Sequence, residues 1–487
     1  MNTTSFFFYD YETFGKDPKK DKIAQFAGIR TDLSFNPIGD PIVLYCKPSK
    51  DFLPDPEACL VTGITPQIAE AQGVSEYEFM ARIKNELGLK GTCHIGYNNV
   101  RFDDEFSRFG FYKNFIDPYS HEWADQNSRL DLLDIIRMTY ALRPEGIQWP
   151  KNEDGSINLK LENLSKVNGI EHENAHDALA DVWATIHMAK LVEKVNPKLF
   201  KYAFGLRDKK VTQKMVEESI DTISPILYIT PFVPLVNGHL SFFVPLSKDL
   251  KNNNAYNGVD VSTSPLVLKE LSADEIRDKL YEKSNGDEKV INRPGLRQVV
   301  INKSSMFVTP KTLNPQRAQS LGIDLEKIKK HQQELEKIIQ EDSSFIKKIN
   351  EVYNTPYPTN EDVDGQLYEG FIGGDDKRLG DRITSMGKTD PRNLSLEYFP
   401  FRDDRLKELL FRYKGRNFYD ALEADELKVF KSYCRAKVID GFGGGTPMSE
   451  YVEKVSDMLN ASESNRDKGI LTSLLKYAEL LEKEISK

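Results

Sequence analysis

The sequence predicts an α/β domain over residues 1–195, a small β-rich domain over 196–350 and an all-α domain over 351–487. Three observations support this division. The first part alternates strand-like and helix-like segments, the second has short apolar runs separated by Pro, Asn and Gly, and the third has mainly helical spacing. A chain of 487 residues also exceeds a single hydrophobic core, and at roughly 150 residues per domain about three domains are expected.

The first domain opens with three strand-like segments and continues with helices and one buried strand. The turn residues of "FNPIGD" favour a three-stranded meander followed by crossover connections. Gly88, Pro144 and Gly169 mark the ends of three helices. The expected strands are 6–9, 25–32, 41–48 and 92–99, and the expected helices are 75–88, 103–115, 130–144, 159–170 and 173–197.

The remaining two domains have a simpler pattern. Turn-rich residues at 353–377 separate them. The stretch "GFGGG" at 441–445 is a flexible connection, because neither a preceding strand nor the P-loop Lys-Ser/Thr accompanies it. The expected strands are 224–234, 239–246, 264–271 and 297–309, and the expected helices are 325–340, 402–416 and 470–485.

Two carboxylates follow the apolar run of the first strand, in "FFFYDYETFG". Alternate residues of a strand share a face, so Asp10 and Glu12 point to the same side. Two neighbouring carboxylates repel each other unless a cation neutralises them, and oxygen-only ligands favour Mg²⁺ or Mn²⁺ over zinc. The pair therefore predicts a metal site that needs further ligands.

The further ligands are expected at strand ends and helix starts. Asp103 follows the buried strand in "NNVRFDDEF", and Asp181 lies on the longest helix of the domain. Asp104 is a rival for Asp103, and Asp177 is a rival for Asp181 because the two are four residues apart on one helical face. Four acids from separate segments can hold two metal ions about 4 Å apart, as phosphodiester hydrolysis requires.

A hydrolytic site also needs a base, and His176 is the candidate. Asn174 is the expected N-cap of the helix, with Asp177 three residues on, so His176 falls in the first turn, where the partial positive charge favours a neutral imidazole. Five residues separate it from Asp181, which is about 140° around a helix. We therefore expect Asp181 to bind metal from the helix and His176 to approach the attacking water from the helix start.

A basic track with interleaved aromatic residues predicts single-strand binding, because bases stack on aromatic rings. The stretch "RFGFYKNFIDPYSHEW" has this composition, and residues 289–323 contain no acid although the whole chain has a net charge of −9. Core packing and solvated surface charge are the alternatives for each residue. The candidates are Arg108, Tyr119, Trp123, Arg137, Arg297, Lys303 and Tyr368.

The D-x-E of the first strand, the Asp after an Asn-rich strand end and the H-x4-D that opens a helix make the sequence resemble the DEDDh family of metal-dependent 3′ to 5′ exonucleases. Further stretches cover nearly the whole chain, among them "AQFAGIRTD", "TGITPQ", "NGIEHENAHDALADV" and "QLYEGF". These are similar to one bacterial branch of that family, the exodeoxyribonucleases that digest single-stranded DNA.

The resemblance implies a ribonuclease-H-like exonuclease domain, a small Src-homology-like β-barrel and a helical C-terminal domain arranged in a C around single-stranded DNA. It also implies processive release of 5′-mononucleotides from the 3′ end with two Mg²⁺ ions, which Mn²⁺ can replace, in DNA repair and recombination. The implied metal ligands are Asp10, Glu12, Asp103 and Asp181, with His176 as general base.

The same resemblance bears on substrate and partner contacts. Glu12 and Lys160 match positions that bind the substrate, although Lys160 stands where arginine is expected in relatives and lacks the bidentate fork for phosphate. The implied protein partner is the single-stranded-DNA-binding protein, whose acidic, Phe-ended tail could be received by Lys and Arg of residues 289–330.

The composition also bears on the cellular location and the oligomeric state. No apolar run approaches the roughly 18 residues that span a bilayer, and the N-terminus lacks a secretory signal. The four cysteines form no C-x-x-C pair, which favours a reducing, cytoplasmic compartment, and a monomer is expected because no coiled-coil pattern occurs. Two alternatives remain: a non-catalytic single-strand-binding scaffold, and a ribonuclease or polymerase proofreading subunit.

Overall fold

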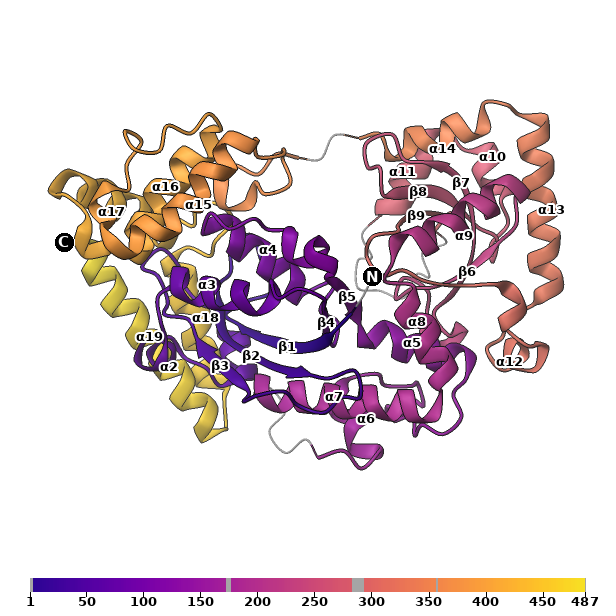
Figure 1. The fold of residues 1–487 in the computed structure, drawn as a ribbon, viewed down its shortest axis with the longest axis horizontal. Coiled ribbons are helices and arrows are strands. Elements are labelled where there is room, and N and C mark those ends of the chain that lie inside the picture. The colour runs from indigo at the N-terminus through magenta and orange to yellow at the C-terminus, as the bar shows by residue number, and fades with distance from the viewer. Residues whose placement is uncertain (1–2, 172–176, 283–292, 356–357, 487) are drawn as a thin grey trace. The chain divides into compact units, whose positions relative to one another are not determined.

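Figure 1 shows the computed structural model of the chain, which describes residues 3–171, 177–282, 293–355 and 358–486. The chain folds into two compact units, and each unit combines segments that are distant in the sequence. The first unit comprises residues 1–128, 172–186 and 358–487, and the second comprises residues 129–171 and 187–357.

The first unit contains a β-sheet with the strand order β3-β2-β1-β4-β5. β1 (Ser5–Thr13), β2 (Ile23–Thr31) and β3 (Ile42–Tyr45) form the antiparallel meander that the sequence predicts, and β4 (Thr92–Gly96) pairs with β1 in parallel. β5 (Ser128–Asp131) is the strand at which the chain passes from the first unit into the second.

The parallel pairing of β1 with β4 determines where the predicted carboxylates lie. The pairing ends at Phe8 opposite Ile95, so Asp10 and Glu12 extend beyond the last paired residue. β4 ends at the same edge of the sheet and leads into α4 (Asp103–Lys113). Asp103, the first residue of this helix, is therefore brought to the edge that carries Asp10 and Glu12.

Helices from both ends of the chain pack in the first unit. Phe14, Phe52 and Cys59 share a buried apolar cluster with Phe430 and Leu471, which explains why the C-terminal segment belongs to the same unit as the sheet. Its helices are α1 (Pro56–Thr62), α2 (Pro66–Gln72), α3 (Glu76–Leu87), α4, α15 (Gly374–Thr389), α16 (Asp404–Asn417), α17 (Ala424–Val438), α18 (Met448–Ala461) and α19 (Asn465–Ser486), while α7 (Ala178–Val195) runs from the first unit into the second.

The second unit contains an antiparallel sheet with the order β10-β6-β7-β8-β9, in agreement with the predicted β-rich part. Ser305 donates a hydrogen bond of 2.9 Å to the carbonyl of Val300. This bond links the end of β9 to the start of β10, the two edge strands, so the sheet curls toward a barrel. The strands are β6 (Ile226–Ile229), β7 (Leu240–Lys248), β8 (Ala255–Asp260), β9 (Leu296–Val300) and β10 (Met306–Val308).

Helices complete the second unit, and short 3₁₀ helices occur in both. The second unit contains α5 (Leu132–Leu142), α6 (Leu161–Val167), α8 (Pro197–Gly205), α9 (Lys209–Thr222), α10 (Leu266–Glu270), α11 (Ala273–Tyr281), α12 (Pro315–Ser320), α13 (Leu325–Glu341) and α14 (Phe345–Tyr353). The 3₁₀ helices are η1 (Ser120–Glu122), η2 (Ala124–Gln126), η3 (Leu235–Asn237), η4 (Pro310–Thr312), η5 (Val363–Gly365), η6 (Pro391–Asn393) and η7 (Tyr419–Ala421). No helix among the described residues is long and apolar enough to cross a membrane.

Several local predictions were wrong. Residues 297–309 were expected to form one strand, but β9 ends at Val300 and β10 begins at Met306, and β8 was not expected. Residues 264–271 were expected to form a strand, but α10 occupies 266–270. Pro265 has helical backbone angles and only Leu268 of the helix is buried, so the alternating burial of a strand is absent. The helix expected over 130–144 begins only at Leu132, because the carboxylate of Asp131 accepts a hydrogen bond from the Leu133 N–H and caps the helix after β5.

Candidate functional site

Three of the predicted carboxylates meet at the end of β1. Asp10, Glu12 and Asp181 each offer an oxygen, and these oxygens lie within 4.8 Å of one another. Glu12 is buried, while Asp10 and Asp181 are half-buried. Two of the acids come from β1 and the third from the first turn of α7, so the cluster depends on the tertiary fold.

The fourth predicted ligand, Asp103, lies beside this cluster and is only 2% exposed. Its Oδ1 accepts a hydrogen bond of 3.0 Å from the backbone N–H of Tyr11, which fixes it against β1 between the two acids. Its rival Asp104 is occupied differently, because its Oδ1 accepts hydrogen bonds from the hydroxyl of Tyr9 and the side-chain amide of Asn99. The geometry therefore favours Asp103 over Asp104.

The two candidate acids of the long helix α7, Asp177 and Asp181, also differ in their surroundings. The Oδ1 of Asp177 accepts a hydrogen bond of 3.0 Å from the N–H of Leu179 and a weaker one from Ala180, so this exposed residue caps α7. Asp181 is the acid that joins the cluster. The predicted base, His176, and the predicted N-cap, Asn174, lie outside the described residues.

Electrostatics shows that this cluster suits a cation. Burial, followed by the charges of Asp103, Glu12 and Asp181, raises the pKa of Asp10 well above its usual value. Burial and then the charges of Asp181, Asp103 and Asp177 raise the pKa of Glu12 to about 9. Without a cation the cluster holds protons at neutral pH, and a divalent ion can replace them. A donor set made only of carboxylate oxygens fits Mg²⁺ or Mn²⁺.

The candidate DNA contacts of the first unit divide into exposed rings and a buried arginine. Trp123 is 66% exposed and Tyr368 is 53% exposed, so both rings are accessible to a base. Arg108 is buried and forms a bidentate ion pair with Glu122 at 2.6 and 2.9 Å. The Arg108 guanidinium also lies 5.7 Å from the ring centre of Tyr119.

The candidate cations of the second unit are also largely paired. Arg137 forms an ion pair of 2.6 Å with Asp134, and Arg297 forms one of 2.9 Å with Asp260. Lys160 precedes α6 and is exposed, as is Lys303 in the turn after β9. The structure therefore brings the four acids to one site and divides the predicted DNA contacts between the two units.

The sequence did not predict two accessible features, an exposed aromatic side chain and a cavity. Phe371, three residues after Tyr368, is 99% exposed, and its place in "QLYEGF" was the only signal available. Arg143 lies at a cavity of about 580 Å³ in the second unit, which "ALRPEG" alone does not reveal. The cavity is lined by Met138, Leu142, Arg143, Val195, Asn196, Pro197, Lys198, Leu199, Tyr202, Val308, Thr309 and Thr312.

A mixed sheet whose first strand ends in a carboxylate cluster is typical of metal-dependent nucleases with a ribonuclease-H-like fold. The family model described as Exonuclease matches residues 7–189, the Exonuclease I SH3-like domain matches 207–355, and the Exonuclease I C-terminal domain matches 361–481. The three-part fold class is thereby confirmed. The chain belongs to the exodeoxyribonuclease I family and is a nuclease, hence a hydrolase.

Individual relatives agree over the whole chain. Exodeoxyribonuclease I of Haemophilus influenzae is 43% identical over 89% of this chain and 90% of its own length. The crystal structure of E. coli Exonuclease I with a dA16 oligonucleotide has 38% identity and a TM-score of 0.89, and covers 98% of this chain and 100% of that chain. A complex of ExoI with SSB-Ct has 38% identity and a TM-score of 0.88 and covers 98% and 99%.

Proposed function

We propose that this protein digests single-stranded DNA from the 3′ end to 5′-mononucleotides, with two Mg²⁺ ions, in DNA repair and recombination. The observation that carries the proposal is the carboxylate cluster of Asp10, Glu12 and Asp181 with Asp103 beside it. The relatives support the substrate, because crystal structures of E. coli Exonuclease I are described in complex with a dA16 oligonucleotide and with ssDNA. All four cysteines are buried thiols, which accords with the proposed cytoplasmic location.

Each residue of the site has a distinct role in this proposal. Asp10, Glu12, Asp103 and Asp181 would hold the ions, which supply an activated water and charge stabilisation at the scissile phosphate. His176 is assigned as the base that accepts the proton of that water. Glu12 also contacts the terminal nucleotide, and the hydrogen bond from the Tyr11 N–H keeps Asp103 oriented toward the cluster.

The remaining contacts would guide the strand. Trp123, Tyr368 and the newly found Phe371 offer exposed rings on which bases stack, each stack contributing about 1–3 kcal/mol. Tyr119, packed beside Arg108, supports the same surface. In the second unit, the contacts assigned to the sugar-phosphate backbone are the exposed Lys160 and Lys303, while the other two candidates, Arg137 and Arg297, already pair with carboxylates.

The test is digestion of a 5′-labelled single-stranded DNA with Mg²⁺ or EDTA, using wild type, Asp10→Ala and the matched control Asp177→Asn. We expect a metal-dependent ladder that shortens from the 3′ end, is lost in Asp10→Ala and persists in Asp177→Asn, whose amide can still cap α7. Tight, salt-sensitive binding without digestion would instead indicate a single-strand-binding scaffold. Preferential trimming of short RNA over long DNA would indicate a ribonuclease.

The cavity at Arg143 is proposed to receive the acidic, Phe-ended tail of the single-stranded-DNA-binding protein. It combines apolar walls from Met138 and Leu142 with the guanidinium of Arg143, whose described hydrogen bonds go to the carbonyls of Leu142 and Thr312 rather than to a carboxylate. The sequence assigned this tail to Lys and Arg of residues 289–330, but that range contributes only Val308, Thr309 and Thr312 to the cavity lining, and the cations of the cavity are Arg143 and Lys198.

This assignment has its own experiment. Arg143→Glu should weaken binding of a fluorescent tail peptide by at least tenfold, and deletion of the terminal Phe from the peptide should have a comparable effect. Lys201→Glu is the matched control, because Lys201 is exposed and does not line the cavity. Equal binding by wild type and Arg143→Glu would place the tail elsewhere.

A further inference from the structure

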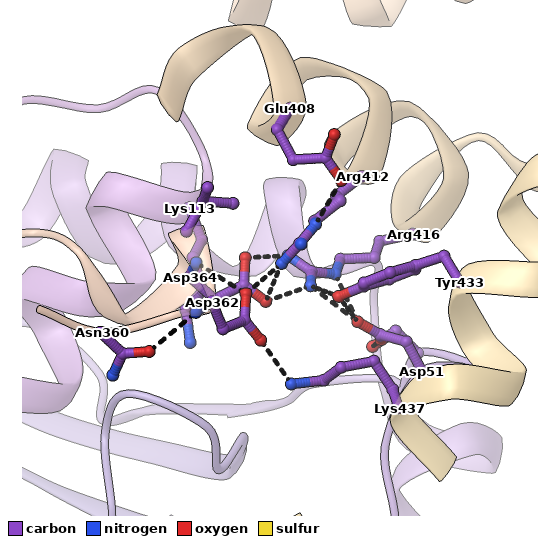
Figure 2. Close-up of polar contacts among 12 residues, drawn as sticks. Asp51, Lys113, Asn360, Asp362, Asp364, Glu408, Arg412, Arg416, Tyr433 and Lys437 are labelled. Carbon is purple, nitrogen blue, oxygen red and sulfur yellow. Dashed lines mark hydrogen bonds and ion pairs between the residues drawn. The ribbon is translucent and has the colours of Figure 1, made fainter. Parts of the chain in front are cut away.

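A buried network of charges in the first unit joins the loop at Asp51 to the helices α16 and α17 and to the segment that contains η5 (Figure 2). Its members come from sequence positions more than 300 residues apart, because Asp51 belongs to the N-terminal part and its partner Arg416 to α16. The catalytic roles proposed above use none of these residues. The labelled members are Asp51, Lys113, Asn360, Asp362, Asp364, Glu408, Arg412, Arg416, Tyr433 and Lys437.

Arg416 is the centre of the network, and its side chain is 2% exposed. Its Nε and Nη2 donate hydrogen bonds of 2.9 and 2.7 Å to Oδ2 of Asp51. Its Nη1 donates one of 3.1 Å to Oδ1 of Asp364, and Nη2 pairs with the other oxygen of the same carboxylate. Nη2 also lies 2.8 Å from the hydroxyl of Tyr433. One guanidinium thus holds the loop and the η5 segment at the same time.

A second arm holds the start of the η5 segment. Asp362 pairs with Arg412, and it accepts a hydrogen bond of 2.6 Å from Nζ of Lys437. Its own N–H donates to Oδ1 of Asn360 at 3.0 Å, and the N–H of Asp364 donates to the Asp362 carboxylate at 3.1 Å. The backbone of this segment is therefore fixed from both sides before the chain reaches Tyr368.

The segment then lies along α4, the helix that begins at Asp103. The hydroxyl of Tyr112 donates a hydrogen bond of 3.1 Å to the carbonyl of Val363. The hydroxyl of Tyr368 donates one of 2.5 Å to Glu105, and the ring of Tyr368 packs edge-on against Phe109 at 5.6 Å. Even so, Tyr368 as a whole residue stays 53% exposed. Tyr368 is thus an accessible ring on a rigidly anchored segment.

We propose that Arg416 and Asp364 are positioning residues for single-strand binding: their buried ion pair anchors the segment that presents Tyr368 beside α4 and continues to Phe371. This inference rests on the proposed role of those two rings. An aromatic platform contributes to affinity only when its orientation is fixed before binding, because ordering it afterwards costs conformational entropy. The bidentate fork of arginine provides this fixation at two carboxylates together, and lysine cannot replace it.

The test compares two buried ion pairs on the same helix. Asp364→Asn removes the ion pair between Arg416 and the η5 segment, while the ion pair between Arg416 and Asp51 remains. Lys414→Met is the matched control, since Lys414 is also buried on α16 but pairs with Glu426 within the C-terminal helices. The readout is steady-state kinetics on a 30-nucleotide oligothymidylate and on a dinucleotide that is too short to reach beyond the metal site.

For Asp364→Asn we expect the KM of the 30-mer to rise about tenfold, which corresponds to about 1.4 kcal/mol, with kcat on both substrates changed less than twofold. Lys414→Met should change neither KM. Equal effects on the 30-mer and the dinucleotide, or the same KM increase in Lys414→Met, would overturn the positioning role. If Asp364→Asn does not fold, Asn360→Ala loosens the same segment without leaving a buried charge. This variant must then raise the KM of the 30-mer more than that of the dinucleotide.

The outcome also distinguishes this inference from the proposed function. If the wild type cleaves neither substrate, the proposed function fails. The positioning role is then judged from the Kd for the fluorescent 30-mer in EDTA, which Asp364→Asn must raise about tenfold and Lys414→Met must leave unchanged. A Kd that is equal in all three proteins would refute the role of the ion pair.

Discussion

Glu12→Gln should stabilise the metal-free protein while it abolishes nuclease activity. The pKa of Glu12 is raised to about 9 in the folded protein, from 4.5 for a glutamate in water, because burial and the charges of Asp181, Asp103 and Asp177 disfavour ionisation. At pH 7 the unfolded chain is ionised at this position and the folded chain is not. Folding therefore costs about 3 kcal/mol, which is the 2.5 pH units between 4.5 and 7 at about 1.36 kcal/mol each.

The sign follows from the raised pKa of an acid. Below about pH 4.5 both states are protonated and the cost vanishes, and it grows as the pH rises toward 9. Glutamine carries no charge and removes the cost. At roughly 2–4 °C per kcal/mol, the apparent unfolding midpoint in EDTA at pH 7 should rise by about 6–12 °C.

The assay is thermal unfolding in EDTA and in Mg²⁺, with Asp177→Asn as the control. Mg²⁺ should raise the midpoint of the wild type and of the control, since both keep the cluster of Asp10, Glu12 and Asp181. It should stabilise Glu12→Gln much less. A lower midpoint of Glu12→Gln in EDTA would refute the reasoning, because it would show that the carboxylate takes part in a stabilising pair rather than in mutual repulsion.

Two further predictions concern the buried charges near α4. Burial, and then the charge of Lys22, lowers the pKa of Lys113 to about 8. Keeping this lysine charged in the folded protein therefore costs free energy below about pH 8, and the cost disappears as the pH rises toward 10.5. Lys113→Met should accordingly raise the free energy of unfolding, measured by urea denaturation, by about 3 kcal/mol at pH 7 and by much less at pH 10. Although burial acts to raise the pKa of Asp51 and of Asp364, Arg416 holds both well below the usual range, so this stability is fully present above about pH 4 and lost as the pH falls through the folded values. The acid unfolding of Arg416→Lys should accordingly begin at higher pH than that of the wild type, and coincident curves would contradict the assignment.

Local pattern was sufficient to predict the sheet and the positions of its acids. The alternation of β1 placed Asp10 and Glu12 on one face, and turn residues indicated the meander. Pattern could not decide between Asp103 and Asp104, because adjacent residues at a helix start differ only in the direction of their side chains. The hydrogen bond from Tyr11 to Asp103 and from Tyr9 to Asp104 favours Asp103 as the ligand.

Partners that are distant in the sequence were not predictable in the same way. Nothing near Asp51 or Arg416 indicates that they meet, since their pairing depends on the packing of both chain ends into one unit. The strand wrongly expected at 264–271 has a related cause, because apolar content does not reveal whether alternate side chains are buried.

The ion pairs also change how DNA binding should depend on salt. Arg108, Arg137 and Arg297 were taken from the sequence as cations for phosphate, but each is paired with a carboxylate. A phosphate contact on a single strand contributes about −0.7 to the slope of log K against log salt, whereas base stacking contributes nothing to it. Lys160→Gln should therefore make the slope shallower by about 0.7, and Trp123→Ala should weaken binding equally at every salt concentration. Titration of a fluorescent oligothymidylate in EDTA between 50 and 200 mM NaCl tests both, and a changed slope for Trp123→Ala would show that this ring acts through the charges around it rather than by stacking.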